Sequence, residues 1–428
     1  SCSKSIVALL LGIAIDRGEI PGVHAPLSEV APDLVPRDAT PGAGSITVQD
    51  LVTMRAGLGA TSGPEYGAWV ASENWVAYAL RRPMVGAPGG RMIAELESAG
   101  ARHIPLEVGK KSPLAVRANA RKVAAIAVQE KADLLHARSR IPAWVANRAS
   151  QKTGIPYLAT WHGIHHGGAL KQRYNKSLIL GERVIAVSHF TGRHIAETYG
   201  VGEDRLRVIP RGVDLSKYLP ENVAGGRIIK LSEQWKVPDG VPVVLMPGRL
   251  TELKGHRVLI DAVDQIRTEI GDWKFVVVIV GDDQGNKGYR ASLEKEIEKR
   301  DLWNVMRMAP HCDDMAAAYK LADIVVVPST SPEAFGRVPV EAQAMGAMVV
   351  AAGHGGLAET VIEGETGFLF TPGDAASLAQ ALQAALTIDL ETRERLSKIA
   401  SSRVHTEYDA RLMVSRTLHV YEEILGAG

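Results

Sequence analysis

SPEAFGRVPVE, residues 331–341, directly follows the apolar run ADIVVVPS at residues 322–329. The run is short and rich in valine, so it predicts a strand buried on both faces, as in a parallel sheet. Glu333 then falls in the loop after this strand, and Glu341 falls in the first turns of a helix expected over residues 338–345. Ligands bind at the carboxyl edge of an open α/β sheet, and a helix N-terminus there favours a phosphate.

Two carboxylates that flank such a phosphate site suit one class of ligand. A nucleotide sugar carries hydroxyl groups on both sides of a diphosphate, those of the sugar at one end and those of the ribose at the other. A glutamate pair with this spacing is weak evidence by itself, because a helix glutamate is more often a solvated surface carboxylate. Further motifs elsewhere in the chain are needed to support a nucleotide-sugar site.

From residue 90 onward, short apolar runs alternate with longer helical stretches. This pattern indicates βαβ units and parallel sheets. We expect two sets of strands, separated by a polar connection at residues 210–242. Two such sets predict two Rossmann-like domains that face each other across a cleft. A final helix is expected at residues 410–425. The expected strands are residues 103–106, 134–136, 157–160, 183–187 and 206–209, then 243–246, 275–280, 305–308, 324–327 and 348–351.

Glu333 and Glu341 match the E-x7-E motif of retaining GT-B glycosyltransferases, and the chain from about residue 90 resembles family 4 of that group. Further matches in the same order are PGRL at 247–250, KG at 254–255, VIVG at 278–281, GGLAET at 355–360 and GETGFL at 364–369. The resemblance implies an α/β fold of the GT-B type and an enzyme that transfers a hexose from a nucleotide sugar.

The same resemblance assigns roles in donor binding. Arg249 and Lys254 would bind the diphosphate, whose oxygens gain negative charge as it departs. Glu333 would contact the donor sugar as a catalytic residue, and Glu341 would bind the ribose hydroxyls. The backbone of Ala334, Phe335 and Gly336 would approach the sugar and the phosphates, which glycine allows because it has no Cβ.

His162, in the sequence TWHG at 160–163, matches the histidine that lies near the transferred sugar in family 4. The alternative is a structural histidine that caps the loop. His165 and His166 follow closely, but no nearby cysteine or carboxylate completes a metal-ligand set. We therefore expect neither a metal nor another cofactor.

Residues 131–140, KADLLHARSR, resemble a loop found in bacterial members of the family. Arg138 and Arg140 are candidate acceptor-binding residues for an anionic glycan or a lipid-linked acceptor, as in lipopolysaccharide synthesis. Pairing with carboxylates of neighbouring helices explains them equally well. The implied mechanism is transfer with retention, in which the departing phosphate deprotonates the acceptor hydroxyl on the same face of the sugar.

Composition narrows the setting of the protein. The formal net charge of +1 gives no reason to expect nucleic-acid binding, and two cysteines make no disulfide framework. The apolar run at residues 6–15 is shorter than the roughly 20 residues that span a bilayer. We expect a cytoplasmic location, with peripheral contact at the inner face of the membrane.

The first block has a different character. Ser1 and Lys4 form S-x-x-K at the start of an apolar helix expected over residues 3–17, and a second helix is expected over residues 48–54. These features resemble serine β-lactamases and penicillin-binding-protein-like hydrolases, in which Ser1 would be the nucleophile and Lys4 its activator. The resemblance stops near residue 89 and lacks the Y-x-N and K-T-G elements, so we predict a vestigial site without hydrolase activity.

The predicted division follows from these resemblances. Residues 1–89 are expected to form a β-lactamase-like fragment, 90–227 an incomplete acceptor-side domain, 228–405 the donor domain and 406–428 a crossover helix. Because residue 1 is Ser, we expect a fragment or a processed product, and because both resemblances are cut near residue 89, we expect a chimeric chain. A serine hydrolase and a nucleotide-binding remnant without transfer activity stay open as alternatives, and so does the base of the donor (UDP, GDP or ADP).

Overall fold

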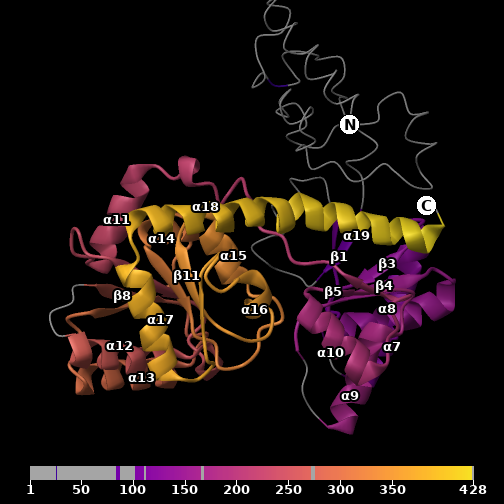
Figure 1. Ribbon diagram of the computed structural model, residues 1–428. Coiled ribbons are helices and arrows are strands. Elements are labelled where there is room, and N and C mark those ends of the chain that lie inside the picture. Colours follow the sequence, from indigo (N-terminus) through magenta and orange to yellow (C-terminus); the bar gives the residue numbers. More distant parts are fainter. Residues whose placement is uncertain are drawn as a thin grey trace, which may run out of the picture. The chain divides into compact units, whose positions relative to one another are not determined.

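The computed structural model describes residues 26, 83–86, 102–109, 112–164, 168–270 and 275–426 (Figure 1). The expected helices at 3–17 and 48–54, together with Ser1, Lys4, His165 and His166, lie outside these residues. The chain divides into two compact units. The first holds the residues up to Leu158, Leu180–Glu182 and those from Leu418 onward, and the second holds Ala159–Ile179 and Arg183–Thr417.

A six-stranded parallel sheet is the centre of the second unit, with the strand order β12-β11-β10-β7-β8-β9. Valine, isoleucine and leucine fill the middle strands, which are buried along their whole length, as expected for a sheet covered on both faces. The strands are β7 (Val243–Pro247), β8 (Val276–Val280), β9 (Met306–Ala309), β10 (Ile324–Val327), β11 (Met348–Ala352) and β12 (Phe368–Phe370).

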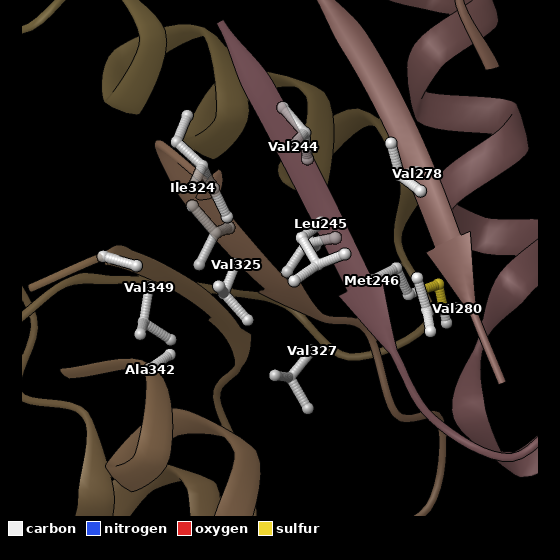
Figure 2. Close-up of a cluster of buried hydrophobic side chains, with 14 of the residues drawn as sticks. Val244, Leu245, Met246, Val278, Val280, Ile324, Val325, Val327, Ala342 and Val349 are labelled. Atoms are coloured by element: carbon white, nitrogen blue, oxygen red, sulfur yellow. The ribbon is translucent and has the colours of Figure 1, made fainter. Parts of the chain in front are cut away.

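The side chains of these strands form a continuous core. Val244 and Leu245 of β7 lie between Val278 of β8 and Val325 of β10, and all four are fully buried (Figure 2). Burying a branched aliphatic side chain stabilises a fold by about 1.5–3 kcal/mol. The sheet is therefore a rigid platform for the loops at its carboxyl edge.

Helices cover both faces of this sheet. α12 packs against α13 and α17, whereas α14 packs against α11 and α15 against α18 (Figure 1). Connections between parallel strands are right-handed, so helices that connect strands in one direction along the sheet cover one face, and helices that connect strands in the opposite direction cover the other. Their bounds are α11 (Gly225–Trp235), α12 (His256–Ile270), α13 (Lys287–Lys299), α14 (Met315–Leu321), α15 (Arg337–Ala344), α16 (Leu357–Thr360), α17 (Ala375–Thr387) and α18 (Leu390–Glu407).

The strand order reverses between β7 and β10. From β7 the chain moves to β8 and β9, then returns to the other side of β7 and continues through β10, β11 and β12. The loops after β7 and β10 therefore begin at neighbouring strand ends at this switch point, the position at which ligands bind in open α/β sheets.

A second sheet of four strands has the order β3-β4-β5-β6, and a separate parallel pair joins β1 to β2. In the first unit, α7 packs against α8. The elements are β1 (Pro83–Gly86), β2 (Arg102–Pro105), α7 (Pro113–Gln129), β3 (Leu135–Ala137), α8 (Arg140–Thr153), β4 (Tyr157–Trp161), α9 (Ala169–Asn175), the 3₁₀ turn η3 (Lys176–Ile179), β5 (Val184–Ala186), α10 (His189–Tyr199) and β6 (Leu206–Val208).

The last helix, α19 (Ala410–Leu425), has the bounds expected from the sequence. Within the first unit, the Tyr421 hydroxyl lies 2.6 Å from Nδ1 of His136 in β3, and the two rings meet edge to face. The C-terminal turns of α19 therefore pack on a strand that lies almost three hundred residues earlier, 285 in sequence separation.

The ten expected strands coincide with β2–β11 to within one residue at each end. The polar connection at residues 210–242 contains two elements that the sequence did not predict, the short 3₁₀ turn η4 (Pro220–Asn222) and α11, which buries Leu231 and Trp235. β12 was also missed, because its three residues are too few to produce a pattern.

Candidate functional site

The candidate site lies at the carboxyl ends of β7 and β10, where the strand order reverses. The 3₁₀ turn η5 (Glu252–Lys254) follows β7, and the loop containing Glu333 follows β10. Lys254 Nζ lies 2.6 Å from Glu333 Oε1, and both side chains are 22% exposed. The structure therefore brings together two of the residues that the sequence assigned to the donor site, 79 positions apart.

Two backbone features place Lys254 against Glu333. Gly255, directly after η5, has a φ of +76°, and a Cβ there would lie 1.8 Å from the carbonyl oxygen of Pro328. Only glycine allows this approach of η5 to the end of β10. Ser329, buried at the start of the next loop, donates its hydroxyl to Glu333 Oε1 at 2.5 Å. The same carboxylate oxygen thus receives an ammonium and a hydroxyl.

Arg249 lies in the loop after β7 and is exposed. The preceding residue, Gly248, is in backbone contact with Gly281, where a Cβ would meet the Gly248 carbonyl oxygen at 1.7 Å. Leu250 N also donates to the carbonyl oxygen of Asp282. The loops after β7 and β8 are therefore held together beneath Arg249, which stands at the same sheet edge as Lys254.

Glu341 lies in α15 and is 7% exposed. Its Oε2 accepts a hydrogen bond from the Tyr319 hydroxyl at 3.0 Å, and its Oε1 accepts one from Arg337 at 2.6 Å. Burial raises the pKa of Tyr319 and of Tyr218, and the charge of Glu341 beside both rings raises each pKa further. Both hydroxyls therefore stay protonated, and Glu341 is a buried carboxylate fixed by neighbouring donors.

The loop between the two glutamates is supported by GGLAET at 355–360. Gly356 N donates to the carbonyl oxygen of Glu333 at 2.7 Å, and a Cβ on Gly356 would meet the backbone of Phe335 at 2.5 Å. Gly336 has a φ of +86° and is the N-cap of α15. This left-handed residue turns the chain from the Glu333 loop into the helix, and as a glycine it supplies no side-chain acceptor to the first N–H groups of α15, which are therefore available to a ligand.

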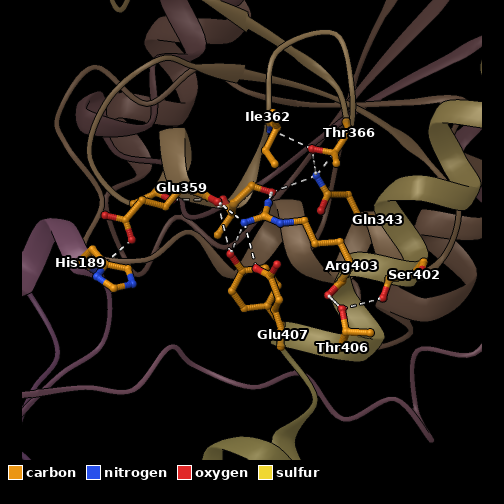
Figure 3. Close-up of polar contacts among 12 residues, drawn as sticks. His189, Gln343, Glu359, Ile362, Thr366, Ser402, Arg403, Thr406 and Glu407 are labelled. Carbon is orange, nitrogen blue, oxygen red and sulfur yellow. Dashed lines mark hydrogen bonds and ion pairs between the residues drawn. The ribbon is translucent and has the colours of Figure 1, made fainter.

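Sequence reasoning missed a contact between this loop and α10. The Ser188 and Thr191 hydroxyls both donate to the carbonyl oxygen of Ala334. Glu359 accepts from His189 N at 2.9 Å and from Phe190 N (Figure 3). Ser188 is the N-cap of α10 and Glu359 supplies a carboxylate to the free N–H groups of that helix, as the helix dipole favours. A helix N-cap and an acidic residue are visible in the sequence, but their pairing is not.

Three family models match the chain. Glycosyl transferases group 1 matches residues 228–403, Glycosyltransferase Family 4 matches residues 82–217, and Beta-lactamase matches residues 1–93. The last two overlap over residues 82–93, close to the expected junction. The resemblance of the first block to β-lactamases is confirmed. The lack of hydrolase activity and the division at residue 89 stay predictions.

Curated relatives of the chain include several D-inositol 3-phosphate glycosyltransferases. That of Thermomonospora curvata is 32% identical over 320 residues, 68% of this chain and 71% of that protein. That of Pseudarthrobacter chlorophenolicus is 30% identical over 286 residues, 63% of this chain and 66% of that protein. The alignments thus span about two thirds of the length of these relatives. The chain belongs to the glycosyltransferase family.

Solved structures show the same fold. A glycosyltransferase from Rickettsia africae superposes with a TM-score of 0.75 at 30% identity, covering 86% of this chain and 96% of that one. The Anabaena protein HepE, solved in complex with UDP and glucose, gives a TM-score of 0.70 at 25% identity, covering 80% and 91%. The predicted α/β architecture of the GT-B type is confirmed for this glycosyltransferase.

The remaining candidate residues of the glycosyltransferase lie elsewhere. His162 follows β4 in the second unit and is half-buried. Arg138 is exposed after β3, and Arg140 is the first residue of α8, both in the first unit. Their role in acceptor binding stays a prediction.

The part of the chain that the structure describes contains no group of three or more His, Cys, Asp or Glu side chains that could hold a metal ion. The expectation of a metal-free site stays a prediction. None of the described helices has both the length and the apolar character needed to cross a membrane.

Proposed function

We propose that the chain transfers a sugar from a nucleoside-diphosphate sugar to an acceptor hydroxyl with retention of configuration. One observation carries the proposal: the Lys254–Glu333 pair and the buried Glu341 flank the N-terminus of α15, at the carboxyl ends of β7 and β10. This arrangement presents carboxylates to two sets of hydroxyls and a cation to the diphosphate between them.

The proposed roles follow the chemistry of the donor. Arg249 and Lys254 stabilise the negative charge that builds on the departing diphosphate, and the free N–H groups of α15 add to this stabilisation. Glu333 accepts hydrogen bonds from the donor sugar and Glu341 from the ribose. His162 is placed beside the transferred sugar by analogy with the family alone.

The departing phosphate is the proposed base. Its oxygen takes the proton of the acceptor hydroxyl while that hydroxyl attacks the anomeric carbon on the same face, so configuration is retained. Cationic side chains and the dipole of α15 do the work that a metal would otherwise do. Transfer is therefore expected to proceed unchanged in the presence of EDTA, and a strict metal requirement would contradict this part of the proposal.

UDP is the favoured nucleotide. HepE has been solved in complex with UDP and with UDP-glucose, and it shares the fold at 25–26% identity. GDP and ADP stay alternatives, because none of the motif residues is assigned to binding of the nucleotide base.

The acceptor is proposed to be an anionic hydroxyl compound, such as a phosphorylated sugar, a polyol phosphate or a lipid-linked glycan. Arg138 and Arg140 supply guanidinium groups that suit a phosphate, and the curated relatives are named for an inositol phosphate acceptor. A role in lipopolysaccharide or other surface glycan synthesis, with peripheral contact at the inner face of the membrane, is consistent with such an acceptor. Arg138→Ala should then raise KM for a phosphorylated acceptor and leave KM for the donor unchanged.

Calorimetry of the purified chain with UDP, GDP, ADP and their glucose conjugates tests the donor site. We expect saturable binding of UDP that Glu341→Ala weakens by at least tenfold. Glu294→Ala is the matched control, because Glu294 forms an exposed ion pair with Arg290 on α13, away from the site. Equal effects of the two substitutions would contradict the role of Glu341.

The same preparation separates the alternatives. Sugar transfer with an anomeric centre of unchanged configuration, read by NMR, supports the glycosyltransferase. Donor binding without hydrolysis or transfer would identify a nucleotide-binding remnant. The match of residues 1–93 to β-lactamases makes a serine hydrolase the other candidate. Acylation of Ser1 by a β-lactam probe would support that activity, and we expect none.

A further inference from the structure

Arg337 lies beside the proposed ribose carboxylate and has no role in the family motif. It is the first residue of α15, four positions before Glu341, and its guanidinium contacts Glu341 Oε1 at 2.6 Å. The two side chains differ in exposure, with 58% of Arg337 and 9% of Glu341 accessible to solvent. One member of the pair is therefore fixed in the protein, and the other is at its surface.

The donors around Glu341 limit what it can accept from a ribose. A carboxylate offers about four lone-pair sites. Tyr319 occupies one on Oε2 and Arg337 occupies one on Oε1. Tyr319 is buried and Arg337 is largely exposed, so a ribose that arrives from solvent competes with Arg337 for the carboxylate.

Arg337 is the donor that can leave at least cost. Tyr319 is 1% exposed, so moving its hydroxyl would leave a buried polar group without a partner. The Arg337 side chain is 58% exposed, so water can solvate its guanidinium when it leaves Glu341. Breaking the Arg337 contact is therefore easily offset by the ribose hydroxyls that replace it.

We propose that Arg337 is a third diphosphate-binding residue, which exchanges Glu341 for the phosphates when the donor binds. The inference rests on the proposed function, because it assumes that Glu341 binds the ribose. Arg337 is the first residue of α15, so its side chain starts at the end of the helix where the phosphates are proposed to bind. Guanidinium groups bind phosphate in a bidentate manner. Binding of the ribose to Glu341 would thus release Arg337 and make its positive charge available to the diphosphate.

Comparing a nucleoside diphosphate with its nucleoside tests this exchange. We expect Arg337→Ala to weaken UDP binding by at least tenfold in calorimetry and to leave uridine binding unchanged or improved, because Arg337 competes with ribose for Glu341. UDP affinity should also fall less steeply with salt in the variant, since one phosphate contact is lost. Arg290→Ala, which removes the exposed i,i+4 pair on α13, is the control and should change none of these quantities.

The outcomes separate this inference from the proposed function. Equal weakening of UDP and uridine would show a structural role for Arg337, and unchanged UDP affinity would show a surface ion pair; either result overturns the inference alone. Absence of binding of UDP, GDP and ADP by the unmodified folded chain would overturn the proposed function and this inference with it.

Discussion

Glu341 shows how single residues decide the chemistry of the site. Glu341 is 7% exposed, and it accepts a hydrogen bond from Tyr319 on Oε2 and one from Arg337 on Oε1. These donors fix the orientation of the carboxylate that is proposed to accept the ribose hydroxyls.

Tyr319→Phe tests this arrangement. The substitution removes the hydroxyl that donates to Glu341 Oε2 and preserves the ring, so the fold should be retained. Loss of one donor to a buried charged group costs about 1.5–3 kcal/mol. We expect a lower unfolding free energy and a UDP affinity reduced by about tenfold, measured by urea titration and calorimetry. Unchanged UDP affinity in a destabilised variant would restrict Tyr319 to a structural role.

At the scale of elements, short loops at strand ends position the site because glycines allow close backbone approach. Gly255 ends η5 against β10, and Gly281 lets the loops after β7 and β8 touch. Gly356 does the same between the start of α16 and the Glu333 loop. Each contact is between backbones, so no side-chain rearrangement can relieve a Cβ placed there.

Gly255→Ala and Gly285→Ala make a matched pair. Both positions have positive φ, +76° and +85°, but only Gly255 is crowded, whereas a Cβ on Gly285 meets nothing within 4 Å. We expect Gly285→Ala to cost about 1 kcal/mol of unfolding free energy through backbone strain alone. Gly255→Ala should cost about 2–4 kcal/mol and also weaken UDP binding, because Lys254 is displaced. Similar losses in the two variants would argue against the close approach of η5 to β10.

At the scale of the whole molecule, a buried histidine links stability to pH. His256, the first residue of α12, is fully buried and shares a hydrogen bond with the Tyr289 hydroxyl at 3.3 Å. Burial, assisted by the nearby positive charge of Lys254, lowers its pKa from 6.5 to about 4. The folded state therefore holds the neutral imidazole in a range where the unfolded state takes up a proton.

The sign of the effect follows from this difference. Above pH 6.5 both states are neutral at His256 and its contribution is complete; between pH 6.5 and about 4 only the unfolded state is protonated, so stability falls. The loss reaches roughly 3 kcal/mol. Urea titrations across this range should give a steeper decline for the wild type than for His256→Gln. Asp314, whose pKa its hydrogen bond with Arg227 lowers, contributes mainly below this range. Parallel declines would contradict the assignment to His256.

Most strands of the six-stranded sheet could be predicted, because each is encoded by the hydrophobic pattern of a few consecutive residues. The run at residues 322–329 is a strand for reasons contained in those residues, and β10 lies within it. The proline-bearing segment at 210–242 hid α11, since a short helix that opens with two glycines has weak intrinsic helix propensity. Its burial of Leu231 and Trp235, and its packing on α14, stabilise it instead.

The sequence by itself determined the two α/β strand sets, the order of the motifs and the residue types that a nucleotide-sugar site requires, because strand periodicity and loop chemistry are read within a few residues. Only the tertiary structure decided that Lys254 pairs with Glu333, that Tyr319 holds Glu341 and that Glu359 caps α10. These contacts depend on which strand ends become neighbours when the sheet order reverses. Hydrophobic pattern fixes which residues enter a sheet, whereas the packing of the complete chain sets the order of its strands.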